Sequence, residues 1–390
     1  MSKTHARTNL RAAMVVLTVG MFATAAYGVK ETVLHGFNSN GSDGYNPDAG
    51  VAVDANGNVY GTTSGGGTFG FGTVFKVDPS GIETVLHSFN ADGTDGTFPF
   101  GSSVALDKVG NLYGTTSRGG TFNFGTVFKI DLSGQETILY SFGASSTDGS
   151  QPNATPVLDA AGNLYGTTSV GGALNFGSVY RITAAGSYSI LYSFKGGNDG
   201  CFPFNSGVVL RNQILYGTTN QCGTGGHGTV YALTQRGVET VLHSFLVDGV
   251  DGTNPYSGVV LDIAGNMYGT TFAGGSFNAG TVFKVTPAGT ETILHNFASN
   301  VTDGVNPYAG LARDNTGNLY GTTQTGGKSG FGVVFRLVPS GVETILHTFV
   351  ANGVDGFFPY FAGVVLGKGA LYGATNEGGA GAGTVYKIAP

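Results

Sequence analysis

Short apolar and β-branched runs alternate with turn residues along most of this chain. Within 95–142 four such runs occur, at 104–107, 110–116, 125–130 and 136–142, and clusters of Gly, Asn, Asp and Pro separate them. Runs of this length and composition, bounded by turn residues, predict β-strands. We therefore predict four strands in a unit of about 50 residues.

The unit is repeated seven times. Its anchor is the tripeptide Tyr-Gly-Thr or Tyr-Gly-Ala, and successive copies lie 51 to 53 residues apart. The anchor tyrosines are Tyr60, Tyr113, Tyr165, Tyr216, Tyr268, Tyr320 and Tyr372. Four strands at this period are typical of a β-propeller blade, whereas β-helix coils are much shorter and sandwich domains are about twice as long. The sequence predicts an all-β, seven-bladed propeller.

A pair of small residues follows the recurring proline in every copy. Strands that converge on a central axis have room only for small side chains, so we place the strand around 104–106 and its equivalents innermost. The strands around 113, 127 and 138 then follow outward in that order. The pairs are Ala49-Gly50, Ser102-Ser103, Ala154-Thr155, Ser206-Gly207, Ser257-Gly258, Ala309-Gly310 and Ala362-Gly363.

The two ends of the repeat region complement each other. The region begins with a rim-type run at 31–37 and ends with a third-strand run at 384–388. The seventh blade lacks a rim strand unless the N-terminal run supplies it. One strand from the start and three from the end would close the ring and remove open sheet edges.

Composition supports an all-β protein with many turns. Glycine accounts for 69 of 390 residues, charged residues for 11% and aromatic residues for 12%. These values exclude a disordered polar chain, a collagen-like chain and a helical bundle. The apolar share of 41% is enough to bury a large core.

The first 28 residues have the pattern of a secretory signal peptide. Lys3, Arg7 and Arg11 precede the apolar stretch 12–26, and small residues suited to cleavage follow, after Ala25 or Gly28. Removing 1–28 leaves one domain, 29–390, with a net charge of −9. We expect a secreted monomer without a membrane span, and the acidic charge argues against nucleic-acid partners.

The phrases Tyr-Gly-Thr-Thr-Ser-x-Gly-Gly and Phe-Gly-Thr-Val-Phe-Lys, as at 60–67 and 71–76, resemble the bacterial extracellular tandem repeat called GloVer. The resemblance covers about 31–390. It implies an exported, propeller-like protein, often with a C-terminal surface anchor, and no settled activity. This chain ends at Lys387-Ile388-Ala389-Pro390 without a hydrophobic tail, which favours free secretion over anchoring.

Two recurring polar positions invite a metal interpretation. Rim histidines His35, His87, His243, His295 and His347 are replaced by Tyr140 and Tyr192 in two copies. Packing tolerates that exchange, and rim positions far apart around the ring cannot share one metal, so we interpret them as structural. The aspartates of the inter-blade Asp-Gly pairs, such as Asp95, could bind calcium. The favoured interpretation is that they bond backbone N–H groups while the glycine takes a positive φ.

Catalytic and phosphate-binding motifs are not evident. The glycine-rich stretches lack a following Lys-Ser/Thr pair, and no Gly-x-Ser-x-Gly elbow occurs. The loop residues at which single copies depart from the repeat are Arg118, Lys195, His227, Lys328 and Glu377. We interpret them as surface charges and assign no catalytic residue and no cofactor.

An aromatic residue follows the loop proline in five copies, with further aromatics just before it. These rings should surround one mouth of the central channel, on the face to which the glycine-rich loops also open. They would form a stacking platform for sugars or apolar ligands, or else fill the mouth. The five residues are Phe100, Phe204, Tyr256, Tyr308 and Tyr360.

Three functions remain open on the sequence alone. The leading one is a binding module for an extracellular glycan or protein at this loop face. The alternatives are a hydrolase or lyase acting on polysaccharide and a structural cell-surface component.

The two cysteines, Cys201 and Cys222, both lie in the fourth copy. One precedes the innermost strand and the other follows the neighbouring antiparallel strand, so both lie at the same edge of one blade. That placement and an oxidising compartment predict a disulfide.

Overall fold

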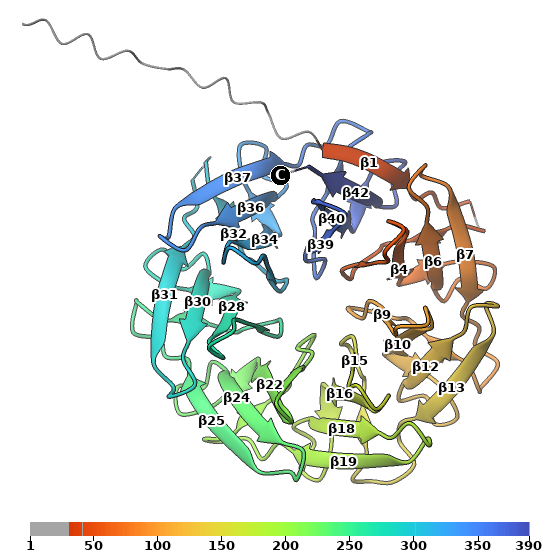
Figure 1. Cartoon of the computed structure of the whole chain (residues 1–390), viewed down its shortest axis with the longest axis horizontal. Helices are drawn as coiled ribbons and strands as arrows, with labels where there is room; N and C mark the ends of the chain where they lie inside the picture. Colours follow the sequence, from red (N-terminus) through yellow and green to blue (C-terminus); the bar gives the residue numbers. More distant parts are fainter. Residues whose placement is uncertain (1–30, 41, 301, 390) are drawn as a thin grey trace, which may run out of the picture.

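The computed structural model describes residues 31–40, 42–300 and 302–389, so the proposed signal peptide 1–28 lies outside the described residues. The described part contains only strands and their connections, and no helix in it is long and apolar enough to cross a membrane. Seven four-stranded antiparallel sheets surround a central axis (Figure 1). The predicted seven-bladed propeller is confirmed.

The order of strands within each blade is also as predicted, and each strand occupies the same place in every blade (Figure 1). The innermost strands are β3 (Ala52–Val53), β9 (Ala105–Leu106), β15 (Val157–Leu158), β21 (Val209–Arg211), β27 (Val260–Leu261), β33 (Ala312–Arg313) and β39 (Val365–Gly367). The second strands are β4 (Val59–Thr63), β10 (Leu112–Thr116), β16 (Leu164–Thr168), β22 (Ile214–Thr219), β28 (Met267–Thr271), β34 (Leu319–Thr323) and β40 (Ala370–Thr375).

The third strands are β6 (Thr73–Val77), β12 (Thr126–Ile130), β18 (Ser178–Ile182), β24 (Thr229–Thr234), β30 (Thr281–Val285), β36 (Val333–Leu337) and β42 (Thr384–Ile388). The rim strands are β7 (Glu83–Ser88), β13 (Glu136–Ser141), β19 (Tyr188–Ser193), β25 (Glu239–Ser244), β31 (Glu291–Asn296), β37 (Glu343–Thr348) and β1 (Glu31–Gly36). In the seventh blade β1 pairs with β42, so the N-terminal strand closes the ring.

Each blade also has a short two-stranded ladder that the sequence analysis treats as loop. The ladder joins the segment after the inter-blade aspartate to the glycine-rich segment after the second strand. The pairs are β2 (Gly44–Tyr45) with β5 (Gly65–Gly66), β8 (Gly96–Thr97) with β11 (Arg118–Gly119), β14 (Gly149–Ser150) with β17 (Val170–Gly171), β20 (Gly200–Cys201) with β23 (Gln221–Cys222), β26 (Gly252–Thr253) with β29 (Ala273–Gly274), β32 (Gly304–Val305) with β35 (Thr325–Gly326), and β38 (Gly356–Phe357) with β41 (Glu377–Gly378).

The glycine of the Asp-Gly pair has a different role from the one expected. Gly96 is not among the residues with positive φ; that conformation falls two residues later, at Phe98. A Cβ on Gly96 would overlap the Thr116 hydroxyl, so glycine is required here for close approach to the second strand. The positive-φ expectation for this glycine is therefore wrong.

Each residue of the Tyr-Gly-Thr anchor makes a specific contact. In the second blade the Tyr113 hydroxyl donates to Asp107 in the turn that precedes it. The glycine leaves room for an aromatic ring of the third strand: a Cβ on Gly61 would lie 2.6 Å from Cζ of Phe75. The threonine reaches the next blade, where Thr270 Oγ1 donates to the Ala309 carbonyl at 2.8 Å.

The hydrophobic core lies between adjacent blades. A phenylalanine just after each rim strand packs edge-to-face on an aromatic ring of the next blade's third strand, and every one of these rings is fully buried. Their ring centroids lie 5.0 to 5.4 Å apart in all seven inter-blade interfaces. At the axis, small residues of adjacent blades touch; a Cβ on Gly363 would lie 2.8 Å from the Gly310 carbonyl oxygen. This close approach explains why a pair of small residues precedes the innermost strand in every copy.

The predicted disulfide joins Cys201 to Cys222, with the two Cα atoms 5.4 Å apart. Cys222 has a φ of 63°. The equivalent residue is glycine with positive φ in the other six blades, for example Gly119 and Gly274. A non-glycine residue in this conformation costs about 1 to 3 kcal/mol, so the bridge stabilises the fold against a local backbone penalty.

Deleting residues 29–38 should destabilise the whole ring. The deletion removes β1 and the buried Phe37, whose loss alone costs about 3 kcal/mol or more, and it exposes the edge of β42. The control reattaches 31–37 after Ile388 through a copy of the turn 131–135, which joins the same two strands in the second blade. We expect Tm to fall by many degrees in the deletion and to recover in the rearranged chain. A deletion variant that melts within a few degrees of the parent contradicts this closure.

Two double variants should separate the disulfide from its backbone penalty. Cys201→Ser with Cys222→Ser should lose about 3 kcal/mol of unfolding free energy, because the unfolded chain is no longer cross-linked. Cys201→Thr with Cys222→Gly restores the residues of the second and fifth blades and should recover about 1 kcal/mol of that loss. Chemical denaturation measures both. Equal stability of parent and serine variant, or two alkylatable thiols in the native parent, would refute this account.

Candidate functional site

The two loop systems of each blade open on one face, as the sequence predicts. The two-stranded ladder fixes this, because it pairs the inter-blade segment with the glycine-rich segment; in the second blade Gly96 lies opposite Gly119. We call this face of the ring the loop face. The turns between first and second strands, such as Asp262–Asn266, lie at the other ends of the same strands.

The predicted aromatic residues come together at the channel mouth on the loop face. Neighbouring ring centroids lie 6.4 Å apart for Phe100–Phe204, 6.1 Å for Phe204–Tyr256, 5.0 Å for Tyr256–Tyr308 and 4.8 Å for Tyr308–Tyr360. All five rings are partly exposed. They form an unbroken arc of aromatic surface.

Phe361 lies inside this arc and is buried, with 6% of its surface exposed. Its ring packs on Phe100, Phe204, Tyr308 and Tyr360 at 4.4 to 5.7 Å. Phe361 therefore fills the channel mouth. The sequence analysis gave this role to the five arc residues, as the alternative to stacking on a ligand. The signal for Phe361 was an extra residue between the loop proline and the small pair, which is Gly101 in the second copy, Asn205 in the fourth and Phe361 in the seventh. Sequence reasoning missed it.

Two pockets adjoin along the arc. One, of about 490 Å³, is lined by Tyr45, Ser64, Gly65, Phe98, Phe100, Ser117, Arg118, Gln151, Asn153 and Phe204. The second, of about 480 Å³, shares Phe100, Phe204 and Gln151 with the first and continues past Asn220, Gln221 and Tyr256 to Phe361. The shared residues make them two parts of one elongated depression.

Amide side chains line both parts of the depression. Asn153 and Asn220 have only 4% and 3% of their surface exposed. Asn153 Oδ1 and Asn220 Nδ2 nevertheless have no hydrogen-bond partner within the described residues. Buried polar atoms without a partner are costly, and they are candidates for contact with a polar ligand.

Backbone strain is concentrated beside this depression. The residue before each loop proline has a positive φ, and in three blades it is phenylalanine: Phe98, Phe202 and Phe358. Each is held by a hydrogen bond from its N–H to the preceding blade, as from Phe98 to the Phe71 carbonyl at 3.0 Å. Strained conformations of this kind cost about 1 to 3 kcal/mol each and are concentrated at functional sites. Phe98 and Phe202 line the two pockets.

The charged loop residues that depart from the repeat are not brought together. Arg118 lines the first pocket and lies over the Phe98 ring, 5.6 Å from its centroid. Lys195 instead lies over Tyr192, whereas Glu377 is exposed in β41 and Lys328 is exposed in a loop. The backbone of His227 forms an isolated β-bridge with the backbone of Cys222, next to the disulfide. Of the five, Arg118 alone belongs to the depression.

A second set of polar groups recurs between the blades, near the rim. Each consists of the rim-strand histidine or tyrosine, the inter-blade aspartate eight or seven residues later, and the first residue of the next rim strand. We call these the seam groups. Five of them contain His, Asp and Glu within 4.8 Å of one another: Glu31–His347–Asp355, His35–Asp43–Glu83, His87–Asp95–Glu136, His243–Asp251–Glu291 and His295–Asp303–Glu343.

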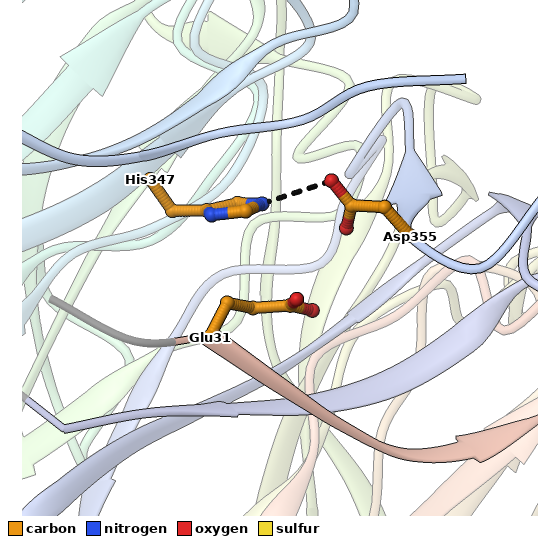
Figure 2. A group of neighbouring side chains, drawn as sticks. All are labelled: Glu31, His347 and Asp355. Carbon is orange, nitrogen blue, oxygen red and sulfur yellow. Dashed lines mark hydrogen bonds and ion pairs between the residues drawn. The ribbon is translucent and has the colours of Figure 1, made fainter. Parts of the chain in front are cut away.

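A β-bulge explains how one rim strand serves two seams. In β7 the register shifts at Leu86, so Glu83 and His87 face opposite sides although they are four residues apart. Glu83 joins the preceding seam and His87 the following one. Figure 2 shows Glu31 of β1 extending beside the hydrogen-bonded pair His347 and Asp355.

The aspartate is the fixed member of each seam group. Asp95 Oδ2 accepts hydrogen bonds from His87 Nε2 at 3.1 Å and from the Asn90 N–H at 3.0 Å. This backbone contact, found in every seam group, is the one that the structural interpretation of Asp-Gly expected. The histidines remain far apart around the ring, as expected, but each has its own two carboxylates.

Burial and neighbouring charge perturb these groups. Burial and the charge of Asp43 raise the pKa of Glu83 to about 7, and burial and Asp355 raise the pKa of Glu31 to about 7. Burial alone would lower the pKa of His87, but the hydrogen bond to Asp95 and the charge of Glu136 raise it. The raised pKa of these glutamates reflects two carboxyl groups that lie close together in a partly buried position.

The two remaining seams carry tyrosine. Tyr140 and Tyr188 stack at a centroid distance of 3.6 Å, and their hydroxyls donate to the two oxygens of Asp148 at 2.8 and 2.7 Å. In the other, Tyr192 donates to Asp199 at 2.9 Å. Tyr188 stands where six rim strands begin with glutamate, so the exchange of histidine in this seam is accompanied by an exchange of glutamate. That joint exchange was the sequence signal for the seam groups.

The repeat sequence, rather than the matches to solved structures, identifies the family of this chain. Solved structures that match the chain include a protein assigned as a gluconolactonase (15% identity, 75% of this chain and 89% of that chain, TM-score 0.41) and a puromycin hydrolase variant complexed with PGG (12%, 84% and 49%, TM-score 0.48). A third is assigned as a 6-phosphogluconolactonase from Bacteroides uniformis (12%, 82% and 91%, TM-score 0.48). Similarity at this level identifies no activity.

A search of curated proteins found no match. The family model described as the Gloeobacter/Verrucomicrobia repeat matches residues 19–231 and 211–390, which together span nearly the whole chain. The protein therefore belongs to the Gloeobacter/Verrucomicrobia repeat family.

Proposed function

We propose that this propeller is a binding module whose loop face holds a carbohydrate chain. The observation that carries the proposal is the elongated depression, in which an arc of partly exposed aromatic rings lies beside amide side chains. Aromatic faces stack on the apolar faces of sugar rings, and amides exchange hydrogen bonds with hydroxyl groups. The combination matches the mixed apolar and polar surface of a sugar.

The dimensions and charge of the depression support the same ligand class. Its two parts measure about 490 and 480 Å³, which is room for several sugar rings in a row. Arg118 is the one charged side chain that lines them. The unpartnered Asn153 Oδ1 and Asn220 Nδ2 would gain partners from hydroxyl groups of a bound chain.

We further propose that the protein works outside the cytoplasm as a monomer. The residue pattern of 1–28 supports export, and a disulfide between Cys201 and Cys222 is compatible with an oxidising compartment. Under this proposal the ligand is an extracellular glycan, free or attached to a surface.

Alanine at Phe204, Tyr256 or Tyr308 should weaken glycan binding at least tenfold while the fold persists. A tenfold change corresponds to about 1.4 kcal/mol, which is within the contribution of one buried stacking ring. A glycan array identifies the ligand, and calorimetry on that ligand measures the loss. Phe69→Ala is the matched control, because Phe69 is 55% exposed and does not line either pocket.

Phe202→Asn adds a variant that the scaffold already accommodates. Asparagine occupies the equivalent positive-φ position in Asn46, Asn254 and Asn306, so folding should be retained while binding weakens. Absence of glycan binding, or binding that survives all four substitutions, would refute the proposal. Release of reducing ends from a polysaccharide would favour the hydrolase alternative instead.

A further inference from the structure

The five His–Asp–Glu seam groups have the composition of metal-ligand sets. Each offers one imidazole nitrogen and two carboxylates, from three chain segments in two adjacent blades. From these groups we propose that the seams bind divalent transition-metal cations of the zinc class, one for each His–Asp–Glu group, and that each cation clamps two blades together.

Unpartnered buried atoms point to a missing ligand. Asp43, Asp251 and Asp355 are more than nine-tenths buried, and Oδ1 of each has no hydrogen-bond partner among the described residues. One oxygen of every seam glutamate is likewise buried without a partner, as is Nε2 of His35 and of His295. The unpartnered glutamate oxygen recurs in all five groups, whereas Oδ1 of Asp95 and of Asp303 accepts from the N–H of the following glycine. A cation would satisfy these atoms together.

Distances within the seams fit such an ion. His295 Nε2 lies 3.5 Å from Asp303 and 3.9 Å from Glu343 Oε1, which exceeds a good hydrogen bond. His243 Nε2 lies 3.7 Å from Glu291 Oε1. Two ligands bound tetrahedrally at zinc distances are about 3.3 Å apart, so a small contraction around the ion completes the site.

The ligand types select the metal. Calcium prefers six to eight oxygen ligands, whereas zinc accepts imidazole nitrogen together with carboxylate oxygen. The side chains of His295 and Glu343 are 18% and 14% exposed to solvent. Water can therefore reach the ion and complete its coordination.

The chain contains its own negative control. The Tyr140–Asp148–Tyr188 seam satisfies both aspartate oxygens with phenol groups and presents no imidazole. It occupies the same place between blades and closes with stacked rings in place of an ion. The fold thus tolerates either arrangement at a seam, so variants that exchange one arrangement for the other should still fold.

The test measures zinc stoichiometry in untagged protein that has been stripped with a chelator. Equilibrium dialysis against ZnCl₂ with elemental analysis should give about five ions per chain, and zinc should raise Tm. Glu343→Gln should lower the stoichiometry by one. His295→Tyr with Glu343→Tyr, which copies the tyrosine seam, should also lower it by one and retain the fold.

The converse variant is the sharper measurement. Tyr140→His with Tyr188→Glu recreates a complete group at the tyrosine seam and should raise the stoichiometry by one. Calcium in place of zinc should not give saturable binding at these sites. Absence of saturable zinc binding by the parent protein overturns the proposal, and so does a stoichiometry that none of these substitutions changes.

Discussion

Each blade of this propeller buries its apolar side chains against the next blade, so a single blade has no core of its own. The phenylalanine after every rim strand inserts across the interface onto a ring of the neighbouring third strand, in all seven interfaces. The anchor glycine leaves room for that ring, and in six blades the following threonine bonds across the interface on the opposite side of the same blade. A single missing contact therefore affects two blades.

Closure gives the loop face its rigidity. The innermost strands touch through glycine and other small residues, which fixes the spacing of the aromatic residues that precede them. The strained backbone at Phe98 and Phe202 persists because each N–H is bound to the preceding blade. The depression on the loop face is thus held in shape by contacts between blades. The seam groups lie nearer the rim and join the same pairs of blades.

Much of this architecture could be predicted because it depends on patterns that repeat. Strand order followed from the small pairs such as Ala309-Gly310, and closure followed from a rim run at 31–37 without a blade of its own. The disulfide followed from the positions of Cys201 and Cys222 at one edge of one blade. The aromatic arc was predicted for the same reason, because every inner strand begins at the same mouth.

The features that sequence reasoning missed depend on local departures from regular geometry. Phe361 occupies an extra position that is Gly101 and Asn205 in two other copies, and its burial in the mouth is a property of the closed ring. The seam groups were hidden because a glutamate and a histidine four residues apart normally share a face of a strand, and the bulge at Leu86 places them on opposite sides. Their third member comes from the next repeat. Pattern within one repeat cannot reveal a group built from two.

Native-state hydrogen exchange tests most directly the claim that the ring is one cooperative unit. The hydrogen-bonded amides of β1 should exchange with the same free energy as those of the rim strands β13 and β25, because opening the closure breaks the core on both sides of it. Exchange of the β1 amides that is orders of magnitude faster, while β13 and β25 stay protected, would contradict this account. It would mean that the N-terminal strand opens independently of the ring.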